Sequence, residues 1–291
     1  MLTELFSIIA PVFVCAAIGF VWKRRGHPFD ADFIITLTTV FGMPCLIFAT
    51  LVKVEMDWNA FRDMAGASVV TFVAFGAVSW AALKVCGLEQ RAFWPGQVFA
   101  NFGNLGLPLC LLAFGQQGLA LAIVYFTIGV VLLFSVGYAV AAGTSSIQRL
   151  VRMPLIYFVA AAMMFVVTGT EPPQWIYATT KLIGDLTIPL MLIALGVSVA
   201  SLEVKSIWRS LGLSLLRLGT GFAVGVVTAL AFGLEGPARG VLILESAMPV
   251  AVFAYLFAAR HDTQPGEVAG TVVVSTAISF ATLPALLWFV L

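Results

Sequence analysis

Apolar runs of about 20 residues, separated by short polar connections, follow one another along almost the whole chain. The first run, LFSIIAPVFVCAAIGFVW, covers residues 5–22 and is followed directly by KRR. An α-helix needs roughly 20 mostly apolar residues to cross the hydrocarbon core of a bilayer. Only 10% of the 291 residues are charged, against roughly 25% in a soluble domain. The pattern therefore predicts an all-α integral membrane protein without a separate soluble domain.

The first apolar run is expected to be a membrane span rather than a secretion signal. A signal peptide carries its basic residues before a shorter apolar core, whereas here the basic residues follow a longer one. The cysteines also lie within apolar runs, at Cys15, Cys45, Cys86 and Cys110. Their spacing suits neither a disulfide framework nor a metal site, so we expect packing roles and no bound metal or other cofactor.

About ten spans can be counted, and the connections between them carry charged or turn-forming residues. The expected spans cover residues 5–22, 32–52, 62–86, 93–114, 118–142, 153–169, 176–200, 206–233, 236–259 and 265–290. The connections after the odd-numbered spans hold ten basic residues: Lys23, Arg24, Arg25, Lys84, Arg91, Arg149, Arg152, Lys205, Arg209 and Arg260. The opposite face holds four: Lys53, Arg62, Lys181 and Arg239. Because Lys and Arg accumulate on the cytoplasmic side, both termini are predicted to lie outside the cytoplasm.

The two halves of the chain, residues 1–145 and 146–291, carry similar spans with a proline near the middle. Aligning Pro44 with Pro189 gives an offset of 145 residues, and aligning Pro108 with Pro249 gives 141. A nearly constant offset is what a duplicated five-span unit would produce, and an odd number of spans places the two copies in opposite orientations. Inverted repeats with interrupted helices are typical of secondary transporters. The alternative is that prolines are simply frequent in membrane helices.

The stretch ANFGNLGLPLCLL, residues 100–112, places poor helix formers inside an apolar span. Proline lacks an N–H group and clashes with the carbonyl four residues earlier, so Pro108 should free the carbonyl of Asn104. Pro249 should likewise free the carbonyl of Glu245 in the second half. Free carbonyls are tolerated at membrane depth only where they line protein or a water-filled cavity. Two interrupted helices are therefore predicted, one in each half.

Polar side chains accompany both breaks. Asn101, Asn104 and Pro108 have the spacing of one helix face, and Gly103 and Gly106 would let another backbone approach closely. Two half-helix N-termini that meet would attract an anion, and asparagine amides would add donors without a fixed charge. The predicted substrate-binding residues are Asn101, Gly103, Asn104, Pro108, Ser246 and Pro249. The alternative is that the two asparagines only join helices by hydrogen bonds.

Glu245 is an acidic residue in the middle of a span, which makes it a candidate ion-coupling residue. It could bind Na⁺ together with freed carbonyls, or it could carry a proton. The alternative is an ion pair with Arg217, the basic residue within the eighth expected span. Asp185 also precedes a proline by four residues, but it lies near a helix end, where an acid in the polar interface is expected.

Three motifs resemble the auxin efflux carrier family, whose bacterial members include malonate-transporter-like proteins: NFGNLGLPL at 101–109, IPLMLIALG at 188–196 and AMPVAVFAYLFA at 247–258. The resemblance covers the whole chain. It implies ten helices in two inverted repeats with crossed, broken helices 4 and 9, as in sodium/proton antiporters and bile-acid symporters. It also implies an organic carboxylate substrate at the crossing, with Pro108 and Pro249 as the crossing prolines and Asn101 or Asn104 facing the carboxylate.

The resemblance further implies a scaffold of spans 1, 2, 6 and 7, a moving part of spans 3–5 and 8–10, a homodimer and a location in the bacterial inner membrane. The moving part would give an elevator-type mechanism of alternating access. The chain differs from the long plant carriers because it lacks their central cytoplasmic loop. Glu245 is not a plant feature, so the coupling mechanism of the plant proteins is not carried over.

Three other functions are weighed against organic-anion transport. A sodium-coupled symporter of the bile-acid type would use the same fold and would show sodium-dependent uptake. A channel would conduct far faster than a carrier. A membrane enzyme is disfavoured because His27 and His261 lie in connections and no nucleophile or metal motif is present. No phosphate-binding loop of the G-x-x-x-x-G-K-[ST] type occurs either, and neither ATP-driven transport nor a nucleic-acid partner is expected.

Overall fold

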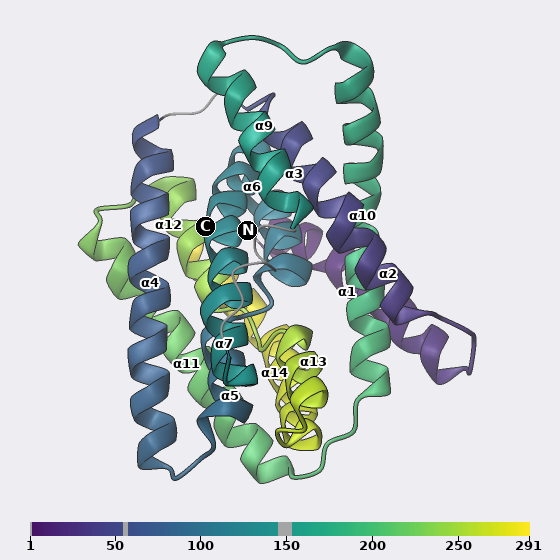
Figure 1. Ribbon diagram of the computed structural model, residues 1–291, viewed down its shortest axis with the longest axis vertical. Coiled ribbons are helices and arrows are strands. Elements are labelled where there is room, and N and C mark those ends of the chain that lie inside the picture. Colours follow the sequence, from purple (N-terminus) through teal and green to yellow (C-terminus); the bar gives the residue numbers. More distant parts are fainter. Residues whose placement is uncertain (1, 55–57, 145–152) are drawn as a thin grey trace.

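The computed structural model describes residues 2–54, 58–144 and 153–291, and these residues are almost entirely helical (Figure 1). The first part contains α1 (Leu2–Arg24), α2 (Ala31–Leu37), α3 (Met43–Leu51), α4 (Trp58–Val85), α5 (Gln90–Val98), α6 (Leu107–Leu132) and α7 (Tyr138–Ala142). The second part contains α9 (Pro154–Thr168), α10 (Gln174–Ser201), α11 (Ile207–Ala231), α12 (Gly236–Ser246), α13 (Val252–His261) and α14 (Pro265–Val290). Wider π-helical turns join some of them, at Thr38–Gly42, Phe102–Gly106 and Leu133–Gly137.

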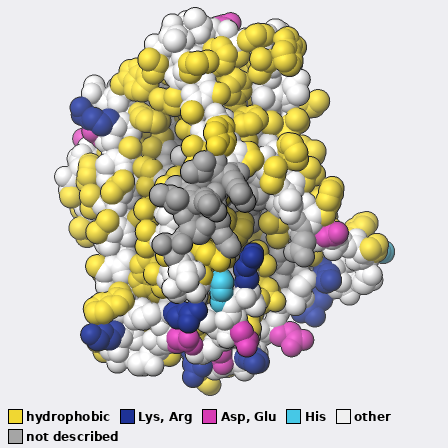
Figure 2. All heavy atoms as spheres, viewed as in Figure 1, with side chains coloured by type: hydrophobic (Ala, Val, Ile, Leu, Met, Phe, Trp, Pro, Cys, Tyr) yellow, Lys and Arg dark blue, Asp and Glu magenta, His cyan; other side chains and the backbone are white. Residues whose placement is uncertain are grey.

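Seven helical segments of the described chain are long and apolar enough to cross a membrane, and α9 is a shorter apolar helix of 15 residues. Large apolar side chains on these segments are exposed rather than packed inside, among them Val73 in α4, Leu182 in α10 and Leu230 in α11. Figure 2 shows apolar side chains over most of the visible face and charged side chains gathered mainly toward its lower end. This distribution suits a surface in contact with lipid and confirms the prediction of an integral membrane protein.

The segment from residue 102 to residue 142 is not one continuous rod. Gly115 has φ 63° and ψ −155°, a conformation outside the helical region that favours glycine. The ring centroids of Phe102 and Phe126 lie 5.7 Å apart, whereas a straight helix would separate two residues of this spacing by roughly 36 Å. The chain therefore folds back at Gly115, and its two arms pack against each other as antiparallel helices.

The helices pack in two groups. In the first group, α10 packs against α1 and α3, and α3 packs against α9. The contact between α1 and α10 is a close approach of two backbones, because Gly196 lies against the main-chain carbonyl of Ala16 and Gly19 lies against that of Ile193. Small residues at such positions are the usual means by which membrane helices approach closely.

In the second group, α11 packs against α12 and α14, α12 against α6, and α4 against α5 and α6. The two interrupted helices of the structure, α5–α6 and α12–α13, both belong to this group. The predicted boundary between the halves at residues 145 and 146, together with Arg149 and Arg152 of the predicted basic face, lies outside the described residues.

Candidate functional site at the helix crossing

Two short extended segments cross at the centre of the second group of helices. One joins α5 to the π-helical turn before α6, and the other joins α12 to α13. Ala100 and Val250 form an isolated antiparallel β-bridge, and the backbone N–H of Asn101 donates to the carbonyl of Pro249 at 2.7 Å. The structure therefore has two broken helices whose breaks are bonded to each other, which we call the crossing.

A cavity of about 360 Å³, the crossing cavity, borders this junction on one side. It is lined from the crossing by Ala100, Asn101, Phe102, Gly103, Asn104, Ala251 and Phe253. From α2, the π-helical turn after it, α3 and α10, the cavity is lined by Ile35, Thr36, Thr38, Thr39, Val40, Met43 and Met191, among others. The N-terminal ends of the turn that begins at Phe102 and of α13 thus both face the same mostly apolar space. An apolar cavity with a few convergent polar groups is the usual form of a small-molecule site.

Asn101 supplies the polar group with the clearest role. Its side chain is 3% exposed and lines the crossing cavity, and its amide Nδ2 has no hydrogen-bond partner among the described residues. Buried polar groups in proteins are nearly always hydrogen-bonded, so an unpaired donor beside a cavity indicates a place for a bound acceptor. Asn104 lines the same cavity and is only partly buried.

Only half of the predicted substrate-binding residues line the crossing cavity. Asn101, Gly103 and Asn104 do, whereas Pro108, Ser246 and Pro249 are absent from its described lining. The expectation of one shared helix face fails because Asn101 lies in the extended segment and Asn104 in the π-helical turn. Pro108 lies beyond that turn, as the second residue of α6.

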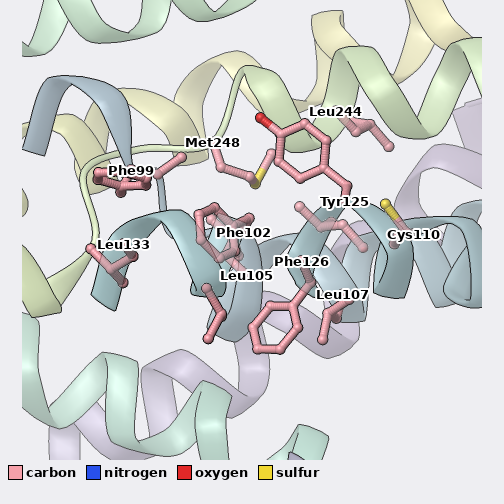
Figure 3. Packing of buried hydrophobic residues seen from close by; sticks show 14 of the residues in the cluster. Phe99, Phe102, Leu105, Leu107, Cys110, Tyr125, Phe126, Leu133, Leu244 and Met248 are labelled. Carbon is pink, nitrogen blue, oxygen red and sulfur yellow. The ribbon is translucent and has the colours of Figure 1, made fainter. Parts of the chain in front are cut away.

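Gly103 and Pro249 hold the crossing together in different ways. A side chain at Gly103 would lie 2.9 Å from the ring of Phe126, so glycine here allows close packing of the two arms. Pro249 contributes its carbonyl to the crossing bond with Asn101. Figure 3 shows the aromatic packing around this point, where Phe99, Phe102, Tyr125 and Phe126 gather beside the crossing. This packing fixes the half-helices that border the cavity.

Glu245 is completely buried in the last turn of α12 and lies against Gly106. Its Oε1 accepts a weak hydrogen bond from the thiol of Cys110 at 3.7 Å, and its Oε2 has no hydrogen-bond partner in the described part of the chain. The main-chain carbonyl of Glu245 accepts a long bond of 3.5 Å from the N–H of Met248. The carboxyl group is therefore enclosed by the helices of the second group and does not line the crossing cavity.

Arg217 does not form the ion pair with Glu245 that the sequence left open. Its guanidinium donates to three main-chain carbonyls instead, from Nη1 to Gln97 at 2.8 Å, from Nη2 to Ser246 at 2.6 Å and from Nε to Met248 at 3.3 Å. Near the two breaks, Arg217 therefore binds the main-chain carbonyls of Gln97, Ser246 and Met248. The sequence predicts instead that the carbonyls of Asn104 and Glu245 are freed, because a proline indicates only the residue four positions earlier.

Interrupted helices that meet beside a cavity, within a helical membrane protein, define the class of membrane transporters. A family model described as membrane transport protein matches residues 5–146 and again residues 139–288. The chain belongs to this family, which is the auxin efflux carrier family, so the resemblance predicted from the motifs is confirmed.

Relatives that are named as transporters agree with this membership. An uncharacterized transporter of Methanothermobacter thermautotrophicus is 28% identical over 97% of this chain and 96% of its own length. An uncharacterized transporter of Methanocaldococcus jannaschii is 22% identical over 67% of this chain and 66% of its own. A protein of Rhizobium meliloti whose name proposes malonate as its transported solute is 21% identical over 99% of this chain and 97% of its own.

Proposed function

We propose that this protein is a secondary transporter that moves a small organic anion, and that the crossing cavity holds the anion's carboxylate. The observation that carries the proposal is the Nδ2 of Asn101, which is buried beside the cavity where two half-helices begin and has no hydrogen-bond partner within the part of the chain that the structure describes. Each helix N-terminus carries roughly +0.5 of an elementary charge, so two of them offer about one positive charge. A carboxylate would match that charge and accept the free hydrogen bond.

The size of the cavity and the relatives support a small carboxylate. The crossing cavity measures about 360 Å³, near the lower end of the usual range for ligand sites. The Rhizobium meliloti relative is named for malonate transport. Transport is preferred to catalysis because the relatives are named as transporters.

The proposal is tested by the melting temperature of purified protein with a series of mono- and dicarboxylates. Malonamide, which keeps the shape of malonate without its charges, is the matched control. We expect at least one carboxylate to raise the melting temperature, and the corresponding amide to have no effect. Equal effects of acid and amide, or no effect of any carboxylate, would contradict a carboxylate site.

We further propose ten membrane crossings in two inverted units of five. The reversal at Gly115 divides residues 102–142 into the fourth and fifth spans, and the breaks at Asn101 and Pro249 fall in the fourth and ninth. The similar spacing of the prolines in the two halves of the sequence supports a duplication. Both termini then lie outside the cytoplasm, and the protein is expected in the plasma membrane, which in bacteria is the inner membrane.

The two groups of helices suit an elevator-type mechanism in which the second group moves against the first. The first group corresponds to spans 1, 2, 6 and 7, the predicted scaffold. A second cavity of about 540 Å³ lies between α3, α6 and α10 and is lined by Thr50, Lys53, Gln116, Tyr177, Lys181 and Asp185, among others. We propose that the two cavities lie on opposite sides of the barrier, with the crossing cavity on the cytoplasmic side, and that two scaffolds pair in a homodimer.

Glu245 is proposed to carry the coupling ion, either H⁺ or Na⁺. The support is its complete burial together with an Oε2 that has no hydrogen-bond partner among the described residues, because a buried acid without an ion-pair partner there is suited to bind and release a cation. Coupling to sodium would make the protein a symporter of the bile-acid type, which is the second candidate function.

A further inference from the structure

Arg217 is buried completely in the middle of α11, where membrane helices rarely carry a basic side chain. Its guanidinium also lies over the ring of Phe75, 4.6 Å from the ring centre. Among the described residues, no carboxylate forms a salt bridge with it, since the salt bridges found there join other residues. The charge of Arg217 is therefore compensated by something other than an acid.

The compensation comes from the ends of the two broken helices. Gln97 lies in the last turn of α5, Ser246 ends α12, and Met248 follows two residues later. The carbonyls of Gln97 and Ser246 are among those that a helix leaves without partners at its C-terminus, and the carbonyl of Met248 lies just beyond the end of α12; all three are bonded to Arg217. Each C-terminus carries roughly −0.5 of an elementary charge, so the two ends together carry about −1. One guanidinium balances them.

The crossing thus has two oppositely charged sides. The N-terminal ends of the turn at Phe102 and of α13 border the cavity, where the proposed anion binds. The C-terminal ends of α5 and α12 converge on the other side, where a cation is required, and Arg217 already occupies that position. A sodium ion at that position would need the same carbonyl oxygens, which already accept hydrogen bonds from the guanidinium.

We propose that Arg217 is the permanent counter-cation of the crossing, and that transport consequently does not depend on sodium. The proposal rests on the proposed transport function and specifies its coupling. Glu245 lies at the same end of α12, and the carbonyls of Ser246 and Met248, which follow it in the chain, are bonded to Arg217 rather than left free for a metal ion. Arg217 is a positioning residue, since it acts on the solute through the two half-helices and does not line the crossing cavity.

The test is chemical rescue of the variant Arg217→Ala. Removing the side chain leaves a space of guanidinium shape that faces three carbonyls. We expect the melting temperature to fall by about 5 °C or more and uptake in proteoliposomes to fall at least about tenfold. Millimolar guanidinium chloride should restore a large part of both, whereas urea, which has the same planar shape without the charge, should restore neither.

Arg209→Ala is the matched control, because Arg209 lies on the same helix but is half-exposed and pairs with Glu267 at 3.5 Å. Guanidinium should not improve this variant. Rescue of Arg217→Ala by urea and guanidinium alike would reduce Arg217 to a packing role and overturn the proposal.

Two further measurements remain informative if Arg217→Ala does not fold. Wild-type uptake should be unchanged when sodium is replaced by N-methylglucamine at constant pH, and a requirement for sodium would overturn the proposal. Arg217→Lys keeps the charge but cannot reach three carbonyls with a planar fork, so it should transport more slowly and still without sodium. Failure of every carboxylate to bind would contradict the proposed function instead, and it would leave guanidinium rescue of stability unaffected.

Discussion

At the scale of single residues, a substitution of Asn101 should affect solute binding much more than the stability of the fold. Asn101→Ala removes an amide whose Nδ2 has no hydrogen-bond partner among the described residues, so the melting temperature without substrate should change little. Binding should weaken by about 1.5–3 kcal/mol, roughly 10- to 150-fold in Kd, because a bond to a charged group is lost. Isothermal titration with the carboxylate identified by melting would measure the change.

Asn101→Asp is the sharper companion variant, since it places a negative charge where the anion is proposed to bind and should abolish binding. Gln116→Ala removes an amide from the second cavity instead and should leave the equilibrium affinity unchanged. Wild-type affinity in both Asn101 variants would show that the cavity does not hold the carboxylate.

Glu245 can be neutralised without breaking an ion pair, because Arg217 binds carbonyls instead. Glu245→Gln should therefore fold with a melting temperature equal to or above that of the wild type, since a buried ionisable group becomes a neutral one of the same shape. Substrate affinity should persist, because the cavity-lining groups are untouched. Uptake driven by an ion gradient should lose its dependence on that gradient; unchanged dependence in a stable variant would exclude Glu245 as the coupling group.

At the scale of helices, the close contact between α1 and α10 predicts that adding one methyl group at this contact lowers stability, whereas adding one at an open position does not. Gly196→Ala would place a Cβ atom against the main-chain carbonyl of Ala16, which cannot rotate away, and should cost about 1–3 kcal/mol. Gly219→Ala in α11 meets open space and should be neutral or stabilising by up to about 1 kcal/mol, because alanine favours helix. The melting temperatures of the two variants compare them directly, and equal values would contradict the close approach of the backbones.

What the sequence revealed about these elements depended on how local each signal is. Apolar length and the turn residues around Gly115 are local, so the helices and the reversal were predictable. The asparagines were found because polar residues beside proline and glycine are unusual in a membrane span. The partners of Arg217 were not predictable, because they are main-chain carbonyls up to 120 residues away and leave no side-chain pattern. The π-helical turn between Asn101 and Pro108 also has no clear sequence signature.

At the scale of the whole molecule, orientation can be tested with a cysteine that the chain already has. Cys86 is exposed at the end of α4, on the basic face that is predicted to be cytoplasmic, while Cys45 and Cys110 are buried. With Cys15 changed to alanine, an impermeant maleimide should label Cys86 only after the cells are opened. The variant Leu291→Cys should be labelled in intact cells, and the reverse pattern would invert the proposed topology.

The hydrogen bond between Asn101 and Pro249 joins the two halves of the chain, and each half brings something different to that meeting point. The first half supplies the amides that border the cavity, whereas the second supplies the buried charges of Arg217 and Glu245. Substitutions of the cavity-lining amides in the first half can therefore change solute preference without removing the buried charges of the second half. In the proposed duplication, this junction requires one unit in each orientation, because each unit contributes only one of the two bonded breaks.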